Sequence, residues 1–298
     1  MASLPIERFQ DQDLVRIGQD ENYLLLAPQH GGRLVRWVLR GEDILYWPGQ
    51  ADWSRAAKIR GGNPLLFPFI GRHFVDGQAG QWRDADGAIR ALPQHGFARD
   101  LPFSVASNDD SSIALALEGS DGTWTGYPHA FRFEAHYRLI DGGLEVALRT
   151  ENRGNTRLPY YAGHHFYLRL PSAQRRESRL RLPPTARRRQ EPDGRLTAAA
   201  KGESAYALDD DRLQDTFHVL QGTGPVTLAM PDRTLSIDLD VPGSIAWHAV
   251  TTWSESAESD FYCVEPWLGL PDAIHNGQGL RWLEPGQAET AICRLRVG

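Results

Sequence analysis

A glutamate and a histidine in this sequence are both set for proton transfer, and each lies in a stretch rich in aromatic residues. Glu265 follows the apolar run at 261–264 and precedes a proline and a tryptophan. We therefore expect it at the end of a buried strand, where a poorly solvated and rigidly held carboxylate can act as a general base. The alternative is a structural glutamate paired with an arginine, which also occurs at such positions.

Histidines supply the second group that such chemistry needs. His164 and His165 are adjacent, so on a strand they point to opposite faces. One of them could face a cleft as a general acid, since histidine titrates near neutral pH. The alternative is a core histidine whose ring nitrogens are satisfied by its neighbours. His95 precedes Gly96, and glycine permits the close approach of a ligand or of another backbone segment.

Arginines and aromatic side chains near these candidates could bind a ligand rich in oxygen. Arg60, Arg72 and Arg99 offer rigid forks of donors, although a surface salt bridge is the alternative for each. Trp267 could lie against the C–H face of a sugar ring or pack in the core. The stretches that mix polar groups with glycine and aromatic residues are 60–72, 93–99, 161–167, 209–217 and 262–267.

The motifs of several other enzyme classes are absent from the sequence. It contains no G-x-S-x-G elbow, no P-loop, no G-x-G-x-x-G and no C-x-x-C. It also lacks H-E-x-x-H and H-x-H spacings, so the histidines give only weak support for a metal centre.

The elements that must position these residues are predicted to be strands almost throughout. Residues 131–140 and 144–150 alternate between apolar and polar side chains around a glycine-rich turn, which predicts an antiparallel hairpin. Further short runs lie at 22–27, 33–39, 112–117, 159–170, 218–220, 226–230, 235–239, 246–252, 261–264 and 289–297. No segment shows a sustained helical period. This pattern predicts an all-β sandwich or barrel, and without a shift in composition we expect one domain over 1–298.

Composition and charge exclude several classes of protein. The chain has 298 residues, a net charge of −6 and two cysteines in strand-like runs, so a disulfide framework is not expected. Its longest basic cluster, at 187–189, adjoins acidic residues and does not indicate nucleic-acid binding. No apolar run could cross a bilayer, and residues 1–13 lack the apolar core of a signal peptide. We therefore expect a cytoplasmic protein without nucleic-acid or membrane partners.

Taken together, these motifs resemble the aldose 1-epimerase family, also called galactose mutarotase-like. The motifs that carry the resemblance lie at 31–36, 60–64, 94–99, 163–167 and 263–267, with the strand pair around Tyr137 and Glu145. They follow the family's order and span nearly the whole chain. The resemblance implies a large antiparallel β-sandwich and the interconversion of α and β anomers of an aldose, with no cofactor or metal.

The resemblance also implies roles for individual residues. Glu265 matches the family's catalytic base, and His165 matches its catalytic acid. His95 matches a histidine that binds near the ring oxygen of the sugar. Asp215 and Arg72 match residues that bind sugar hydroxyls. Other aspartates at 209–211 lie close enough in sequence to take the place of the first of these.

The substrate and the alternatives to an epimerase stay open at this point. Arg60 and Arg99 match arginines that contact phosphate in the branch acting on hexose 6-phosphates, whereas residues 70–72 and 163–166 look more like the branch acting on free sugars. We therefore place a free aldose ahead of a sugar phosphate as the small-molecule partner. A non-catalytic carbohydrate-binding sandwich would keep Trp267 and the arginines. A glycoside hydrolase would need a second carboxylate, for which Asp215 is the candidate. The sequence gives no oligomeric state.

Overall fold

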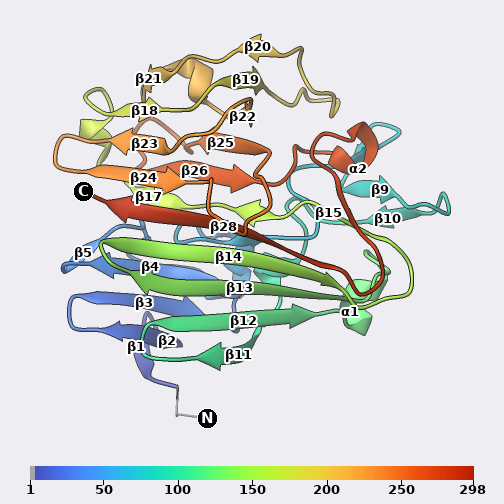
Figure 1. The fold of residues 1–298 in the computed structure, drawn as a ribbon, viewed down its shortest axis with the longest axis horizontal. Helices are drawn as coiled ribbons and strands as arrows, with labels where there is room; N and C mark the ends of the chain where they lie inside the picture. The colour runs from blue at the N-terminus through green and yellow to red at the C-terminus, as the bar shows by residue number, and fades with distance from the viewer. Residues whose placement is uncertain (1–3) are drawn as a thin grey trace.

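The computed structural model describes residues 4–298, so the first three residues of the predicted domain and of the N-terminal segment lie outside it. Within this range the chain is built from β-strands that pair antiparallel, which confirms the all-β prediction (Figure 1). The helices are single turns or short 3₁₀ segments: α1 (Asp121–Trp124), α2 (Ala273–Asn276), η1 (Trp53–Lys58), η2 (Ala98–Asp100), η3 (Ser172–Gln174) and η4 (Asp211–Leu213). No helix among residues 4–298 has the length and apolar character to span a membrane.

The largest sheet in the described part of the chain has nine strands. Their order is β11 (Ser104–Asn108), β12 (Ser112–Glu118), β13 (Phe131–Ile140), β14 (Gly143–Asn152), β28 (Ala288–Val297), β24 (Thr234–Asp238), β23 (Val226–Ala229), β18 (Arg179–Arg181) and β21 (Ala205–Ala207). The predicted hairpin is confirmed, because β13 and β14 pair along their whole length around the glycine turn. Side chains alternate along β13, so Phe133, Ala135 and Tyr137 are fully buried in the core.

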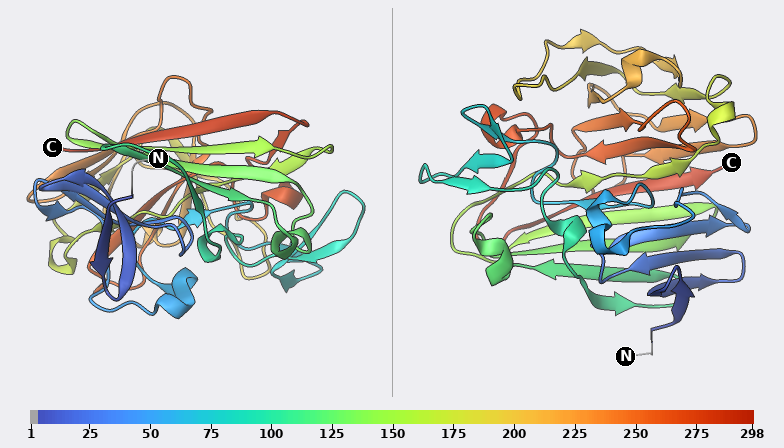
Figure 2. Two further views of the ribbon diagram at one scale, coloured as in Figure 1. Left: turned by 90° about the horizontal axis from the view of Figure 1, so that it is seen from below. Right: turned by 180° about the vertical axis from the view of Figure 1, so that it is seen from behind.

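A second sheet of eight strands in residues 4–298 carries the candidate site residues that lie on strands. Its order is β20 (Ala200–Lys201), β19 (Thr185–Arg188), β22 (Thr216–Leu220), β25 (Ala249–Trp253), β26 (Phe261–Trp267), β16 (Gly163–His164) and β6 (Leu65–Leu66), with β17 (Tyr167–Arg169) also pairing with β26. Figure 2 shows the long strands β13, β14 and β28 in one layer, with other strands beneath them. The ring of Phe67, next to β6, stacks on Phe133 of β13 at 4.4 Å between ring centroids, so the two sheets share one core.

Smaller sheets complete the described residues. The N-terminal segment forms β1 (Ile6–Phe9), β2 (Gln12–Gln19), β3 (Asn22–Ala27), β4 (Arg33–Leu39) and β5 (Glu42–Asp43). The strand pairs are β7 (Phe74–Val75) with β8 (Gln78–Ala79), β9 (Gln81–Arg83) with β10 (Ile89–Ala91), and β15 (Leu158–Tyr160) with β27 (Arg281–Leu283). Neither Cys263 nor Cys293 forms a disulfide, and both are buried.

Two predicted strands differ from the observed ones in a way that matters for the site. The run at 159–170 is divided into β15, β16 and β17, which belong to different pairings. The strand predicted to stop at 264 continues to Trp267, because β26 keeps its register with β25 past Pro266. Glu265 therefore lies within a strand rather than at its end. The pairing of β26 with β25 on one side and with β16 and β17 on the other fixes the position of Glu265 in the sheet.

Candidate active site

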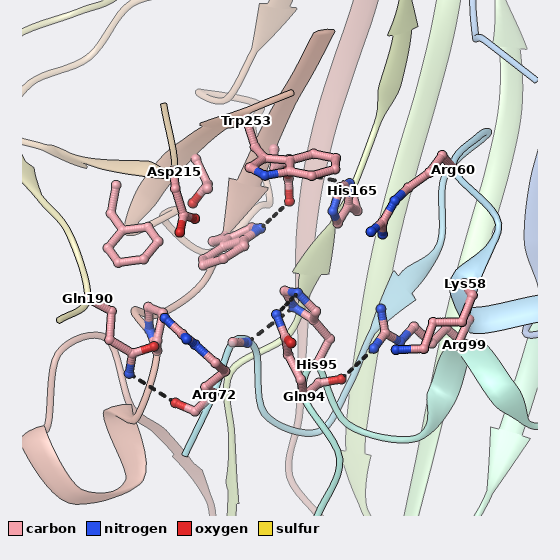
Figure 3. Close-up of a pocket in the computed structure, with 17 residues that line it drawn as sticks. Lys58, Arg60, Arg72, Gln94, His95, Arg99, His165, Gln190, Asp215 and Trp253 are labelled. Carbon is pink, nitrogen blue, oxygen red and sulfur yellow. Dashed lines mark hydrogen bonds and ion pairs between the residues drawn. The ribbon is translucent and has the colours of Figure 1, made fainter. Parts of the chain in front are cut away.

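All eight residues singled out from the sequence line one cavity of about 290 Å³ (Figure 3). They are Arg60, Arg72, His95, Arg99, His165, Asp215, Glu265 and Trp267. They come from segments separated by up to 207 positions in the chain, and the eight-stranded sheet and the loops beside it bring them together. The cavity is open to solvent at one side and has a predominantly polar wall, which suits a ligand carrying many hydroxyl groups.

Glu265 lies at the floor of this cavity and is almost completely buried, with 1% of its surface exposed. Side chains on β26 alternate, so Glu265 shares its face with Cys263 and Trp267. The indole Nε1 of Trp267 donates a hydrogen bond to Oε2 of Glu265 at 3.2 Å. Burial raises the pKa of Glu265 well above its usual range, although this hydrogen bond acts in the opposite direction.

His165 faces Glu265 from the segment that follows β16. Its Nδ1 lies 3.4 Å from Oε1 of Glu265, although that nitrogen has no partner with hydrogen-bond geometry. The imidazole stacks on the ring of Tyr167, with 4.6 Å between centroids. Burial lowers the pKa of His165 well below its usual range, and the positive charges of Arg99 and Arg60 lower it further.

The backbone of His165 is held by a buried asparagine. Oδ1 of Asn63 accepts a hydrogen bond from the backbone N–H of His165 at 3.0 Å. Nδ2 of the same side chain lies 3.1 Å from Nδ1 of His164, whose ring points away from the cavity into the core. The two adjacent histidines thus take the two environments that the sequence left open. Burial lowers the pKa of His164 to about 3, so this ring is neutral and accepts from Asn63 at Nδ1.

His95 occupies the opposite side of the cavity in a left-handed backbone conformation with φ 67°. Its Nδ1 accepts a hydrogen bond from the backbone N–H of Gly71 at 3.2 Å, which places the ring proton on Nε2. Its ring lies edge-on to Trp267 and to His165, with 5.9 Å between centroids in each pair. Gly96 is required by the approach of another backbone segment, because a Cβ there would lie 2.1 Å from the carbonyl oxygen of Phe67.

Cationic side chains gather at one end of the cavity. Figure 3 places Lys58, Arg60 and Arg99 together on the side away from Asp215. Arg60 pairs with the half-exposed Glu255 at 3.1 Å and lies over the ring of Trp253. Arg99 donates to the backbone oxygen of Gln94 at 2.7 Å, while its buried Nε has no partner. The salt-bridge alternative therefore describes part of the role of Arg60, but both arginines also border the cavity.

Arg72 and Asp215 border the opposite end. The amide of Gln190 donates to the backbone oxygen of Arg72 at 3.1 Å and so supports that segment. Asp215 has a left-handed backbone, with φ 47°, and comes directly before β22. The aspartates at 209–211 do not line the cavity, so Asp215 is the acidic residue of this stretch that borders it.

Several residues of the cavity wall were not predicted from the sequence. Trp253 lies at the end of β25, where the expected strand stopped one residue earlier, and its ring is edge-on to His165 at 5.9 Å. Lys58 closes the short helix η1. Ala57, Gln190, Thr251 and Pro271 complete this group. Only the tryptophan carried a recognisable signal, since an aromatic residue beside a predicted strand end can offer its ring face to a sugar.

Known proteins resemble this chain both in sequence and in structure. The family model described as aldose 1-epimerase matches residues 13–295. The solved structure of Slr1438 protein from Synechocystis sp. PCC 6803 is 25% identical, covers 100% of this chain and 98% of that chain, and has a TM-score of 0.82. A galactose mutarotase related enzyme from Lactobacillus acidophilus is 21% identical over 96% of this chain and 97% of that chain, with a TM-score of 0.79.

A curated relative bears on a shorter part of the chain. The Escherichia coli (strain K12) protein named "Putative glucose-6-phosphate 1-epimerase" is 29% identical over 137 residues, which is 44% of this chain and 42% of that protein. The matched region thus spans less than half the length of this relative. The solved structures confirm the galactose mutarotase-like fold, and the family model extends over nearly the whole sequence. The chain belongs to the aldose 1-epimerase family.

Proposed function

We propose that this protein is an aldose 1-epimerase that interconverts the α and β anomers of a free aldose. The observation that carries the proposal is the pair formed by Glu265 and His165, with 3.4 Å between Oε1 and Nδ1, at the floor of the cavity. A carbohydrate-binding protein without activity would need the aromatic and cationic wall but not two buried groups that exchange protons.

The reaction requires one proton to leave O1 of the sugar and one to reach the ring oxygen. Glu265 takes the proton from the O1 hydroxyl, and His165 delivers a proton to the ring oxygen as the bond from C1 to that oxygen breaks. Rotation about the C1–C2 bond then presents the other face of the aldehyde. The two side chains reverse their roles to close the ring. Each positioned proton transfer typically contributes about 10²–10⁴-fold in rate.

The pair needs one proton in total to work. Burial raises the pKa of Glu265 and lowers that of His165, so in the empty cavity this proton resides on the carboxyl group. When this proton moves to the imidazole, the ionised carboxylate can take the proton of the O1 hydroxyl. The two forms carry the same number of protons, so pH does not change their ratio and only sets the fraction of enzyme with one proton on the pair.

The remaining lining residues bind and orient the sugar. His95 points its Nε2 side toward the ring oxygen, and Asp215 and Arg72 bind hydroxyl groups. Trp267 supports Glu265 through its indole N–H and offers its ring to a C–H face of the sugar. These groups bind without a metal or cofactor, and no proton-transfer step needs one.

A hexose 6-phosphate is the second candidate substrate. Arg60, Arg99 and Lys58 together form a cationic end of the cavity, and arginine forks suit a phosphate dianion. The partial similarity to proteins named as glucose-6-phosphate 1-epimerases supports this alternative. We keep the free aldose first, because the pairing of Arg60 with Glu255 already neutralises part of that charge.

Polarimetry of freshly dissolved α-glucose and α-galactose tests the proposal, with anomer exchange of glucose 6-phosphate followed by NMR. We expect catalysis above the buffer rate, and Glu265→Gln should lower kcat by about 10²-fold or more because it removes the base. Arg90→Gln, a change at a half-buried arginine that does not line the cavity, serves as the control. Full activity of Glu265→Gln would refute the assignment of the base.

A further inference from the structure

A third side chain with metal-binding chemistry lies behind the proposed catalytic pair. Cys263 is fully buried and comes two positions before Glu265 on β26, so both side chains project from the same face of the strand. One ligand atom from each of His165, Cys263 and Glu265 lies within 4.8 Å of the other two. A thiol, an imidazole and a carboxylate are the three ligand types that Zn²⁺ prefers in proteins.

The spacing of these atoms is close to that of a tetrahedral site. With zinc bonds of about 2.0–2.3 Å, neighbouring ligand atoms lie about 3.4–3.6 Å apart. The distance from Nδ1 of His165 to Oε1 of Glu265 is already 3.4 Å. The remaining ligand atoms lie up to 4.8 Å apart, so a bound ion would have to draw them together by up to about 1.2 Å.

One nitrogen of this cluster, and one hydroxyl oxygen beside the cluster, are buried without a hydrogen-bond partner among the described residues. Nδ1 of His165 is buried and has no hydrogen-bond partner, and the residue is 92% buried. Oγ1 of Thr251, on the strand position opposite Glu265, is also buried without a partner. Buried polar atoms without partners are uncommon in folded proteins and each one asks for an explanation. A bound cation would give this imidazole nitrogen a partner.

We propose that His165, Cys263 and Glu265 form a binding site for a thiophilic divalent cation such as Zn²⁺, and that occupancy of this site blocks epimerisation. The ion forms bonds to the sulfur, to one imidazole nitrogen and to one carboxylate oxygen. The protons of the thiol and of the carboxyl group are released to solvent, and no electron is transferred. The fourth position faces the cavity and takes a water molecule.

Inhibition follows because the ion occupies both groups that the reaction uses, and this consequence rests on the proposed function. Binding itself does not depend on it. Mg²⁺ and Ca²⁺ prefer sets of oxygen ligands and should not compete at this site. The site would therefore make the activity sensitive to the soft metals of its environment while leaving it indifferent to the abundant hard cations.

Cobalt spectroscopy on the intact chain tests the site without any assay of activity. Co²⁺ replaces Zn²⁺ in such sites, and a thiolate ligand adds a charge-transfer band in the near ultraviolet. The chain has two cysteines, so a band that persists in Cys293→Ser arises from Cys263. We expect one equivalent of Co²⁺ to produce the band in the wild type and in Cys293→Ser, and Zn²⁺ to remove it. The proposal would be overturned if the wild type showed no band, or if the wild type showed the band and Cys293→Ser did not.

A second variant connects the metal to the activity. Cys263→Ser should lose the band, keep its metal-free activity and require at least about tenfold more Zn²⁺ for half inhibition, since even outer-shell changes cost 10–100-fold in metal affinity. Added EDTA should restore the wild type. Equal zinc sensitivity of Cys263→Ser and the wild type would refute the site. If the wild type shows no epimerase activity, the proposed function fails while the cobalt band still decides the metal site.

Discussion

The buried Asn63 gives the sharpest test of how the fold positions His165. Asn63→Leu keeps the approximate volume of the side chain but removes both of its polar atoms. The backbone N–H of His165 and Nδ1 of His164 then lose their partners, which lie at 3.0 and 3.1 Å in the wild type. Both groups are buried away from water, so no solvent molecule replaces the amide.

The size of the effect follows from these two bonds. A buried polar group left without its partner costs about 1–3 kcal/mol, so two of them lower the free energy of unfolding by about 2–6 kcal/mol. An unfolding entropy of about 2.1 cal/mol/K per residue gives roughly 0.6 kcal/mol/K for this chain, so Tm falls by about 3–10 °C. A displacement of the imidazole by about 1 Å can cost about 10²-fold in rate, so kcat should fall by about 10–100-fold.

Thermal unfolding and the kcat of α-glucose mutarotation, measured below the unfolding transition, check these values. Asn152→Leu is the matched control, because Asn152 is equally buried and makes hydrogen bonds to Thr156, Leu283 and Gly154, away from the cavity. We expect this control to lose stability but to keep its kcat per folded molecule. An unchanged kcat in Asn63→Leu, with a loss of stability like that of the control, would refute the positioning role.

Three further predictions concern pH, phosphate recognition and backbone packing. The pH profile of kcat/KM, which reports the free enzyme, should be a broad bell. Activity is lost only below the lowered pKa of His165, where both groups are protonated, and above the raised pKa of Glu265, where neither group is protonated. A single narrow optimum of kcat/KM near pH 6.5 would contradict this. If glucose 6-phosphate is a substrate, Arg99→Leu should raise the KM of glucose 6-phosphate by about 10–100-fold and leave the KM of glucose within about threefold. Equal changes in KM for both sugars would exclude a contact between Arg99 and the phosphate. Gly96→Ala should markedly lower Tm in a thermal melt, because the added Cβ would lie 2.1 Å from the carbonyl oxygen of Phe67. The backbone φ of 73° at this position also disfavours alanine. An unchanged Tm would show that this loop relaxes freely.

Much of the fold could be predicted from the sequence because it depends on local patterns. The alternation at 131–140 and 144–150 and the glycine turn between them predict the hairpin β13–β14, and the structure confirms it residue by residue. The first strands were harder to find, since β1 has only four residues, none of them fully buried, and β2 mixes polar and apolar residues without a clean alternation. The extent of β26 was misjudged, because Pro266 suggested an end that the neighbouring strand overrides. The expected single domain over 1–298 stays a prediction.

The candidate site could also be predicted only in part from the sequence. Motifs around Arg60, His95, His165 and Glu265 could be recognised, since glycines and aromatic residues beside polar groups are visible in the sequence. Their convergence on one cavity could not, because β16 and β26 are separated by 96 residues in the sequence, 165–260, and are neighbours only in the folded sheet. Residues with no local signal, such as Lys58, were missed for that reason.

Local patterns along the chain account for the alternation of the strands, the turns between them and the types of side chain available for proton transfer. Three features of the site depend on the folded chain: His165 rather than His164 faces Glu265, Asp215 rather than an earlier aspartate reaches the cavity, and Cys263 lies behind the pair. The physical reason is that periodicity fixes which residues share a face of one strand, whereas distances between strands depend on register and on packing across the whole core.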